Sequence, residues 1–194
     1  MSAGYTRPVK IRVAATILCA CWWIAEYIRS SFHDKTATNN LDKGSSKLWD
    51  LGHFVGVIGI ITGFTAIGRV QVGERWIPMC GFALMLMGIS VRWLAIHTLW
   101  EYFTGKVSIL EGQRLVKAGL YRHLRHPAYA GALLAKLGLG LAFDNWISVV
   151  LIFFPILLAA LYRMRVEEEV LREAFGSEYA DYSASTKRLI PGIY

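Results

Sequence analysis

The sequence is short of charged residues. Asp, Glu, Lys and Arg make up 18% of its 194 residues, whereas 55% are hydrophobic, and the mean hydropathy is +0.39. Water-soluble globular domains carry about 25% charged residues, so too few ionisable groups are present to coat an ordinary soluble surface. The scarcity of charge therefore excludes an ordinary soluble domain and indicates an integral membrane protein.

Cysteine is also scarce, with three residues in the whole chain. Cys19, Cys21 and Cys80 each lie inside an apolar run, and their spacing matches no metal site. We therefore expect them to pack as small hydrophobic side chains, and we expect no metal. Segments of about ten residues with alternating polarity, which are typical of membrane barrels, do not recur. The sequence thus favours an all-α membrane fold.

Five apolar runs approach the roughly 20 residues that an α-helix needs to cross a bilayer. Asp144 and Asn145 leave room only for a tight turn between the last two runs, which predicts an antiparallel helical hairpin. The prediction is a polytopic protein with about five transmembrane helices and a single membrane domain, residues 1–194. The runs are approximately 9–28, 48–67, 77–102, 128–143 and 146–162.

The net charge of +7 is unevenly distributed along the chain. With five crossings, the segments 29–47 and 103–125 and the tail after residue 162 fall on one side and hold most of the basic residues. The positive-inside rule then places that side and the C-terminus in the cytoplasm, and the cell membrane is the expected location in a prokaryote. These charges lie in short loops without a nucleic-acid-binding fold, so we expect membrane lipids, and no nucleic acid, as partners. The opposite side holds Arg7, Lys10, Arg12, Arg69 and Arg75.

Polar residues inside the third apolar run form a possible functional stripe. Arg92 lies deep in the run, and Trp93, His97 and Glu101 follow one another at intervals of four residues, which places them on one helix face. Charges in a bilayer usually face a partner or a cavity. The stripe is therefore either a polar helix-packing face or the wall of a cavity.

Two further charges lie in apolar runs. Glu26 is near the end of the first run, where it is expected to reach the membrane interface. Lys136 is in the fourth run and is interpreted as a buried or snorkelling charge.

The longest polar loop, 103–125, leads into His126 and Pro127 at the start of the fourth apolar run. Its basic residues are compatible with contacts to anionic lipid head groups. A proline in the first turn of a helix, however, predicts a helix start whose free N–H groups and partial positive charge suit a carboxylate. Tyr129 lies close to the same face. The loop's possible donors are Lys106, Gln113, Arg114, Tyr121, Arg122, His123, Arg125 and His126.

A second polar pair follows the fifth apolar run. Arg163 and Glu167 are four residues apart, so they lie on one helix face and form either a surface salt bridge or part of a site. The glycines of the stretch from Gly138 to Gly140 are inside an apolar run, where close helix packing explains them better than a nucleotide-binding loop.

Two motifs together resemble the isoprenylcysteine carboxyl methyltransferases: "GQRLVKAGLYRHLRHPAYAG" and, after the predicted hairpin, "RMRVEEEVLREAFGSEYADYSASTKRLIP". The resemblance covers roughly residues 106–191 and is closest to a compact prokaryotic member. It implies an integral membrane enzyme that transfers a methyl group from S-adenosylmethionine, leaving S-adenosylhomocysteine, to the carboxylate of a lipid-like acceptor such as a C-terminal isoprenylcysteine. It further implies that the cytoplasmic loop and the C-terminal helix form the cofactor pocket.

The same resemblance implies roles for particular residues. Arg163 and Glu167 would be catalytic, and Arg163 would also meet the acceptor carboxylate. Apart from the resemblance, we hypothesise that the lipid tail enters sideways between helices, along Arg92, Trp93 and His97. Where family members often carry a histidine before the Leu-Val pair, this chain has Gly-Gln-Arg. The residues implied in cofactor binding are Lys106, Gln113, Arg114, Leu115, Val116, Tyr121, His126, Pro127, Ala128, Tyr129 and Glu167.

Other activities remain open from the sequence. A phospholipid-amine or thiol methyltransferase could share this scaffold, and a membrane sterol-type reductase using NADPH has a similar segment that typically reads RH-x-N-Y. A transporter is disfavoured because no inverted repeat is present. Residues 1–75 contain two apolar runs without a family motif, so the catalytic core is predicted to be residues 76–194.

Overall fold

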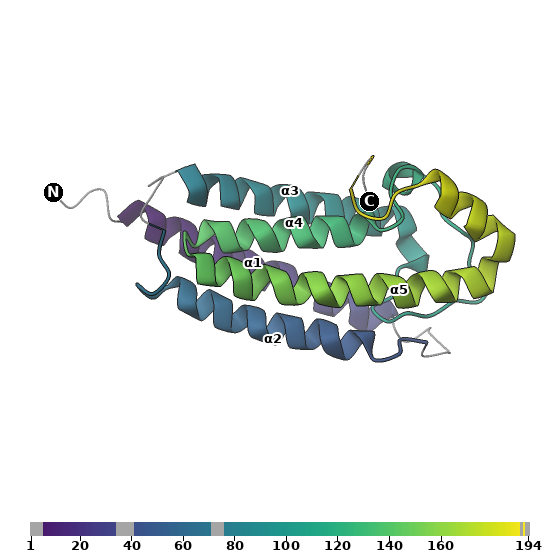
Figure 1. The fold of residues 1–194 in the computed structure, drawn as a ribbon, viewed down its shortest axis with the longest axis horizontal. Coiled ribbons are helices and arrows are strands. Elements are labelled where there is room, and N and C mark those ends of the chain that lie inside the picture. Colours follow the sequence, from purple (N-terminus) through teal and green to yellow (C-terminus); the bar gives the residue numbers. More distant parts are fainter. Residues whose placement is uncertain (1–5, 34–40, 71–75, 191, 193–194) are drawn as a thin grey trace.

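The computed structural model describes residues 6–33, 41–70, 76–190 and 192. Within them the chain forms five α-helices and no extended strand, which confirms the all-α prediction. Figure 1 shows the helices running side by side, with α5 extending past the others at one end of the bundle. The helices are α1 (Thr6–His33), α2 (Ser45–Gly63), α3 (Trp76–Leu99), α4 (Pro127–Ala142) and α5 (Trp146–Ser185).

Three of the described helices are long and apolar enough to cross a membrane, over Val9–Ser31, Trp76–Tyr102 and Trp146–Ser185. The apolar helix α4 has 16 residues, which at 1.5 Å per residue is about 24 Å and falls short of a bilayer core. The α2 helix has 19 residues, but Lys47, Asp50 and His53 lie in its first half. The protein is a multi-pass membrane protein whose helices differ in the length of their apolar segments.

The helix after the hairpin is much longer than the expected run 146–162, because it continues to Ser185. Gly176 has a φ of 50°, which interrupts the helical geometry and turns the last segment back towards the bundle. The polar pair Arg163 and Glu167 therefore belongs to the same continuous helix as the apolar run. This continuity holds both side chains in a fixed position relative to the membrane segment.

The hairpin turn forms as predicted. Asp144 adopts a positive φ of 51°, and Asn145 caps α5 by accepting the backbone N–H groups of Ile147 and Ser148 at 3.0 and 3.2 Å. Its amide also donates to the Ile67 carbonyl at 2.7 Å, which ties the segment after α2 to the turn. An Asn at this position satisfies donors that a helix start otherwise leaves free.

Close packing of α3 on α4 depends on residues without side chains. A Cβ atom on Gly138 would collide with the backbone at Met85, and one on Gly88 would collide with the backbone at Ala135. Small residues allow helix backbones in membranes to approach each other closely. The structure therefore confirms that Gly138 is a packing residue, and Gly140 plays the same part against Val149 of α5.

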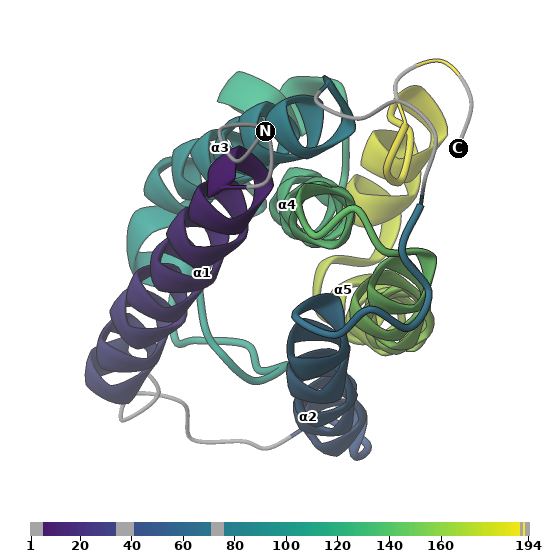
Figure 2. The same cartoon turned by 90° about the vertical axis from the view of Figure 1, so that its left-hand side faces the viewer.

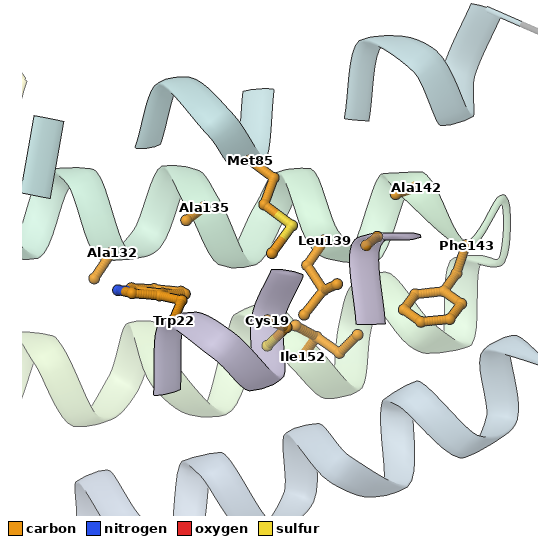
Figure 3. Packing of buried hydrophobic residues seen from close by; sticks show 10 residues of the cluster. Cys19, Trp22, Met85, Ala132, Ala135, Leu139, Ala142, Phe143 and Ile152 are labelled. Carbon is orange, nitrogen blue, oxygen red and sulfur yellow. The ribbon is translucent and has the colours of Figure 1, made fainter. Parts of the chain in front are cut away.

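The remaining helices flank this pair. The α1 helix contacts α3 and α4, whereas α2 packs mainly on α5. Figure 2 shows α4 between α1 on one side and the pair of α2 and α5 on the other. One apolar core contains Trp22, Met85, Leu139 and Ile152 from four different helices (Figure 3). Cys19 is buried in it as expected, but Cys21 and Cys80 are exposed, because their helices α1 and α3 present those positions outward.

Candidate active site

A cavity of about 380 Å³ lies among all five helices and the loop between α3 and α4. Its wall includes the start of α4, the middle of α5, the second half of α1 and the first half of α2. Most of the residues predicted to bind cofactor or substrate line this one space. Those are Arg92, Lys106, Gln113, Arg114, Leu115, Val116, Tyr121, His126, Ala128, Tyr129, Arg163 and Glu167.

The centre of the site is a chain of three side chains. The Arg163 Nε donates to the Tyr129 hydroxyl at 2.9 Å, and this hydroxyl donates to Glu167 Oε2 at 3.0 Å. The two residues four apart on α5 are thus joined through a tyrosine of α4, and the structure records no direct ion pair between them among the described residues. The expected surface salt bridge is replaced by a bridge between two helices.

Arg163 is buried, with 6% of its surface exposed, and its guanidinium has a partner on each side. Nη1 donates to Asp42 Oδ1 at 3.1 Å and to Ser45 Oγ at 3.3 Å. Nη2 donates to the Gly105 carbonyl. The planar guanidinium is therefore fixed in one orientation at the cavity wall.

Asp42, which the sequence analysis did not identify, organises this part of the site. Its carboxylate also accepts the Ser45 hydroxyl and the Ser46 backbone N–H, both at 2.7 Å, and so holds the first turn of α2. Burial alone would raise the pKa of the Asp42 carboxyl, but the hydrogen bonds from Ser46 and Ser45 and the charge of Arg163 hold that pKa below its usual value. The sequence signal that could have identified Asp42 is its position shortly before Ser45 and Ser46, where an Asp is typical of a helix start.

The start of α4 is held by the C-terminal segment. The Arg125 and His126 backbone N–H groups donate to the carbonyls of Lys187 and Arg188 at 2.7 and 3.1 Å, and Lys187 donates back to His123 at 3.2 Å. His126 is the residue before the helix and Pro127 is its first residue, as predicted. Pro127 is buried but is not part of the cavity wall.

Glu168 is the second residue that the sequence analysis missed. It is buried, and its carboxylate oxygens lie 3.1 Å from Arg125 Nε, 2.5 Å from Arg188 Nη2 and 3.2 Å from His126 Nε2. The run of three glutamates concealed this role, since only the tertiary structure shows that Glu168 faces inward while Glu169 reaches an exposed Lys43. Glu168 therefore fixes His126 and the C-terminal segment together.

Arg92 has a well-defined partner in the membrane segment. Its Nε and Nη2 donate to the two carboxylate oxygens of Glu26 at 2.6 and 3.0 Å, and its Nη1 donates to the Ala128 carbonyl at 3.2 Å. Trp22 and Arg29 donate to the same carboxylate at 3.2 and 3.3 Å. The expectation that Glu26 simply reaches the interface is wrong, because its carboxylate is the counter-ion of Arg92.

The predicted stripe on α3 does not form a cavity wall. Trp93 packs against the apolar core, and His97 is exposed with its ring 5.3 Å from Trp100. Neither lines the cavity. One residue along a helix rotates the side chain by about 100°, so Arg92 faces inward while the face of Trp93 and His97 turns away.

The loop residues serve different purposes. The Gln113 side chain accepts the Leu110 N–H at 2.9 Å and so shapes the loop, whereas Arg122 and His123 are exposed and outside the cavity wall. Burial raises the pKa of Tyr121 well above its usual value, which keeps its hydroxyl neutral. In the described part of the chain no group of three His, Cys, Asp or Glu residues could hold a metal ion.

Comparison with known proteins shows a shared fold and a similarity to one family. The family described as isoprenylcysteine carboxyl methyltransferase matches residues 80–173. The solved structure of the eukaryotic intramembrane Ras methyltransferase superposes with a TM-score of 0.57 over 75% of this chain and 52% of that one, at 24% identity, which shows a shared fold.

Two curated proteins support the same assignment. A probable protein-S-isoprenylcysteine O-methyltransferase of Oryza sativa subsp. indica is 32% identical over 128 residues, which cover 63% of this chain and 66% of that protein. The corresponding protein of Saccharomyces cerevisiae is 34% identical over 125 residues, covering 63% and 52%. This chain therefore spans slightly less than two thirds of the rice protein and about half of the yeast one. The family model covers slightly less than half of the chain, and over that part the chain is similar to the isoprenylcysteine carboxyl methyltransferases.

Proposed function

We propose that the protein transfers the methyl group of S-adenosylmethionine to the carboxylate of a lipophilic acceptor such as a C-terminal isoprenylcysteine. The observation that carries this proposal is the bridge from Arg163 through Tyr129 to Glu167 in the wall of a cavity that continues among membrane helices. The bridge offers a cation for an acceptor carboxylate next to an anion for a donor group of the cofactor.

The residues around the cavity fit this cofactor. The buried Tyr179 hydroxyl has no hydrogen-bond partner in the described part of the chain, and Tyr179 belongs to the cavity wall. A buried polar atom without a partner is costly unless a ligand satisfies it. We assign cofactor binding to Glu167, Tyr179, the segment 113–116, Tyr121 and the residues from His126 to Tyr129.

When bound, S-adenosylmethionine supplies a methyl group on a positively charged sulfur. The acceptor needs no general base, because a carboxylate is already ionised at neutral pH. The task of the protein is then to orient the acceptor and to keep water away from it, and both favour a reaction in which opposite charges cancel. Arg163 aligns the carboxylate, while Tyr129 and Asp42 prevent the guanidinium from rotating.

The acceptor chain extends from Arg163 towards the membrane segment of the cavity. Trp22, Trp49, Ala132 and Ile156 offer apolar wall there, and they come from α1, α2, α4 and α5. The predicted path along Trp93 and His97 is replaced by one along the Arg92–Glu26 pair. The first two helices, which lack a family motif, then complete the acceptor site, and the catalytic core is not confined to residues 76–194.

An amine acceptor fits this site less well. The cavity wall contains seven lysine and arginine side chains against three carboxylates among its described residues. Such a wall attracts anions and repels a protonated amine. We place the site at the cytoplasmic face of the cell membrane, as the distribution of basic loops indicates.

Calorimetric binding to the detergent-purified protein tests the cofactor. We expect S-adenosylhomocysteine to bind, the double variant His126→Ala, Glu167→Ala to lose binding, and reduced nicotinamide not to bind. Methyl transfer to an S-prenylcysteine then tests the acceptor. Binding of the nicotinamide without the homocysteine product would overturn the proposal in favour of a reductase.

A further inference from the structure

Lys136 is a charged side chain in the membrane part of the cavity that the proposed methyl transfer does not use. It lies within the apolar helix α4, and 8% of its surface is exposed. It belongs to the cavity wall together with Tyr129 and Ala132, which precede it on one face of α4 at intervals of three and four residues. Helical side chains lean towards the helix N-terminus, so Lys136 leans towards the methyl-transfer end.

The ammonium of Lys136 has no hydrogen bond or ion pair with any residue that the structure describes. Its one recorded contact is with the ring of Trp22, whose centroid is 5.3 Å from Nζ. An ammonium has three N–H donors, and an aromatic face satisfies none of them as an acceptor oxygen does. Lys136 is thus a buried amine that faces the cavity, and no described residue accepts a hydrogen bond from it.

The carboxylate of Glu26 does not serve as the counter-ion of Lys136. Its two oxygens already accept both Arg92 donors and those of Arg29 and Trp22, at distances of 2.6 to 3.3 Å. The single negative charge of Glu26 is thus already paired with two arginines, Arg29 and Arg92. The occupant of the cavity is then the available source of an anion for Lys136, because ionisable groups in membranes are retained where they meet a partner or a substrate.

We propose that Lys136 binds a second anionic group carried on the hydrophobic chain of the methyl acceptor. The acceptor class would be an amphiphile with two anions, one methylated beside Arg163 and one held by Lys136. Tyr129 and Lys136 are seven positions apart on α4, which places the two anions about 10 Å apart along the helix. This inference rests on the proposed carboxyl methyl transfer and names its substrate class, which differs from a plain prenyl chain.

The test compares S-alkylcysteines that differ only at the end of the alkyl chain, which carries a methyl, a carboxylate or an ammonium group. Chain lengths are chosen to bracket about 10 Å. The carboxylate-ended compound is expected to have a kcat/KM at least 10-fold above the methyl-ended one, since a hydrogen bond to a charged group is worth about that much. The ammonium-ended compound should be the poorest acceptor. Mass spectrometry must locate the new ester on the cysteine carboxylate.

Three variants separate charge from packing. Lys136→Met keeps the bulk of the side chain and should abolish the preference for the carboxylate, while improving turnover of the methyl-ended chain. Lys136→Arg should retain the preference. Lys47→Met removes an exposed lysine outside the cavity wall and should change neither. A preference that survives in Lys136→Met, or no preference in the wild type, overturns the proposal.

Direct binding distinguishes failure of this inference from failure of the proposed function. Calorimetric titration of the same compounds, with and without S-adenosylhomocysteine, requires no turnover. Lys136-dependent binding of the carboxylate-ended chain without any methyl transfer would support the second anion site and reject the proposed reaction. Methyl transfer to both chains with equal binding would support the reaction and reject the second site.

Discussion

The two ends of the cavity differ in how their charges are balanced. At the end near the C-terminal segment, Arg163 and Arg125 are paired with Asp42 and Glu168, two carboxylates that lie outside the cavity wall. At the membrane end, Lys136 contacts the ring of Trp22 and forms no ion pair with a described residue. The first end is held rigid before any ligand arrives, whereas the second depends on its ligand for charge balance. Charges that are held in place before the ligand binds can stabilise a transition state, whereas a charge that needs a partner favours substrates that supply one.

The largest expected effect comes from breaking the rigid end at Arg163. Arg163→Ala should lower methyl transfer by roughly 100- to 1,000-fold, as loss of a preorganised donor does in other enzymes. The matched control is Arg165→Ala, two residues away on the same helix, which is exposed and outside the cavity wall. A protein with Arg163→Ala that binds S-adenosylhomocysteine and keeps full turnover would contradict the assignment.

Removal of the buried carboxylate tests whether the rigid end is built on charge pairing. Glu168→Gln removes the negative charge that Arg125 and Arg188 both contact. It is expected to destabilise the fold by about 2 kcal/mol or more, because removing one partner of a buried ion pair is strongly destabilising. The melting temperature in detergent measures this. The adjacent Glu169→Gln removes an exposed pair with Lys43 and should leave the melting temperature unchanged. Equal melting temperatures for both variants would show that Glu168 contributes nothing special.

The same comparison can be sharpened by pH through Asp42. Because its pKa is lower in the folded protein than in the unfolded chain, its stabilising contribution is complete above about pH 4 and is lost as the pH falls further. Asp42→Asn should therefore melt earlier than wild type at pH 7, and the difference should shrink below about pH 4. Asp181→Asn, at an exposed position, should follow the wild-type curve throughout. A constant gap at all pH values would rule out a charge effect at Asp42.

The smallest effect is expected where the sequence predicted a substrate contact and the structure places none. His97 is exposed beside Trp100 and outside the cavity wall, so His97→Ala should change kcat/KM by no more than about two-fold, as surface substitutions do. A larger loss of kcat/KM in a variant of unaltered stability would indicate that the acceptor binds along the face of α3 that contains His97.

The sequence by itself determined the membrane class, the helix order, the hairpin turn at Asp144 and Asn145, and the residues at the start of α4. These follow from local rules: apolar length, turn chemistry and the missing N–H of proline. Arg163 and Glu167 were also within reach of the sequence, because their spacing on one helix is local and the two motifs that surround them resemble a known family.

Only the tertiary structure decided which distant groups balance the charges. Asp42 meets Arg163 across 121 positions of sequence, and Glu26 meets Arg92 across 66. Helical periodicity shows which residues share a face but does not fix the rotation of a helix in the bundle, so the sequence could not show that Arg92 lines the cavity while Trp93 and His97 do not. The orientation of α4 likewise left Lys136 facing the cavity, with the Trp22 ring as its recorded contact among the described residues. Charge pairing in a membrane protein depends on helix packing, and the packing of five helices is a property of the whole chain.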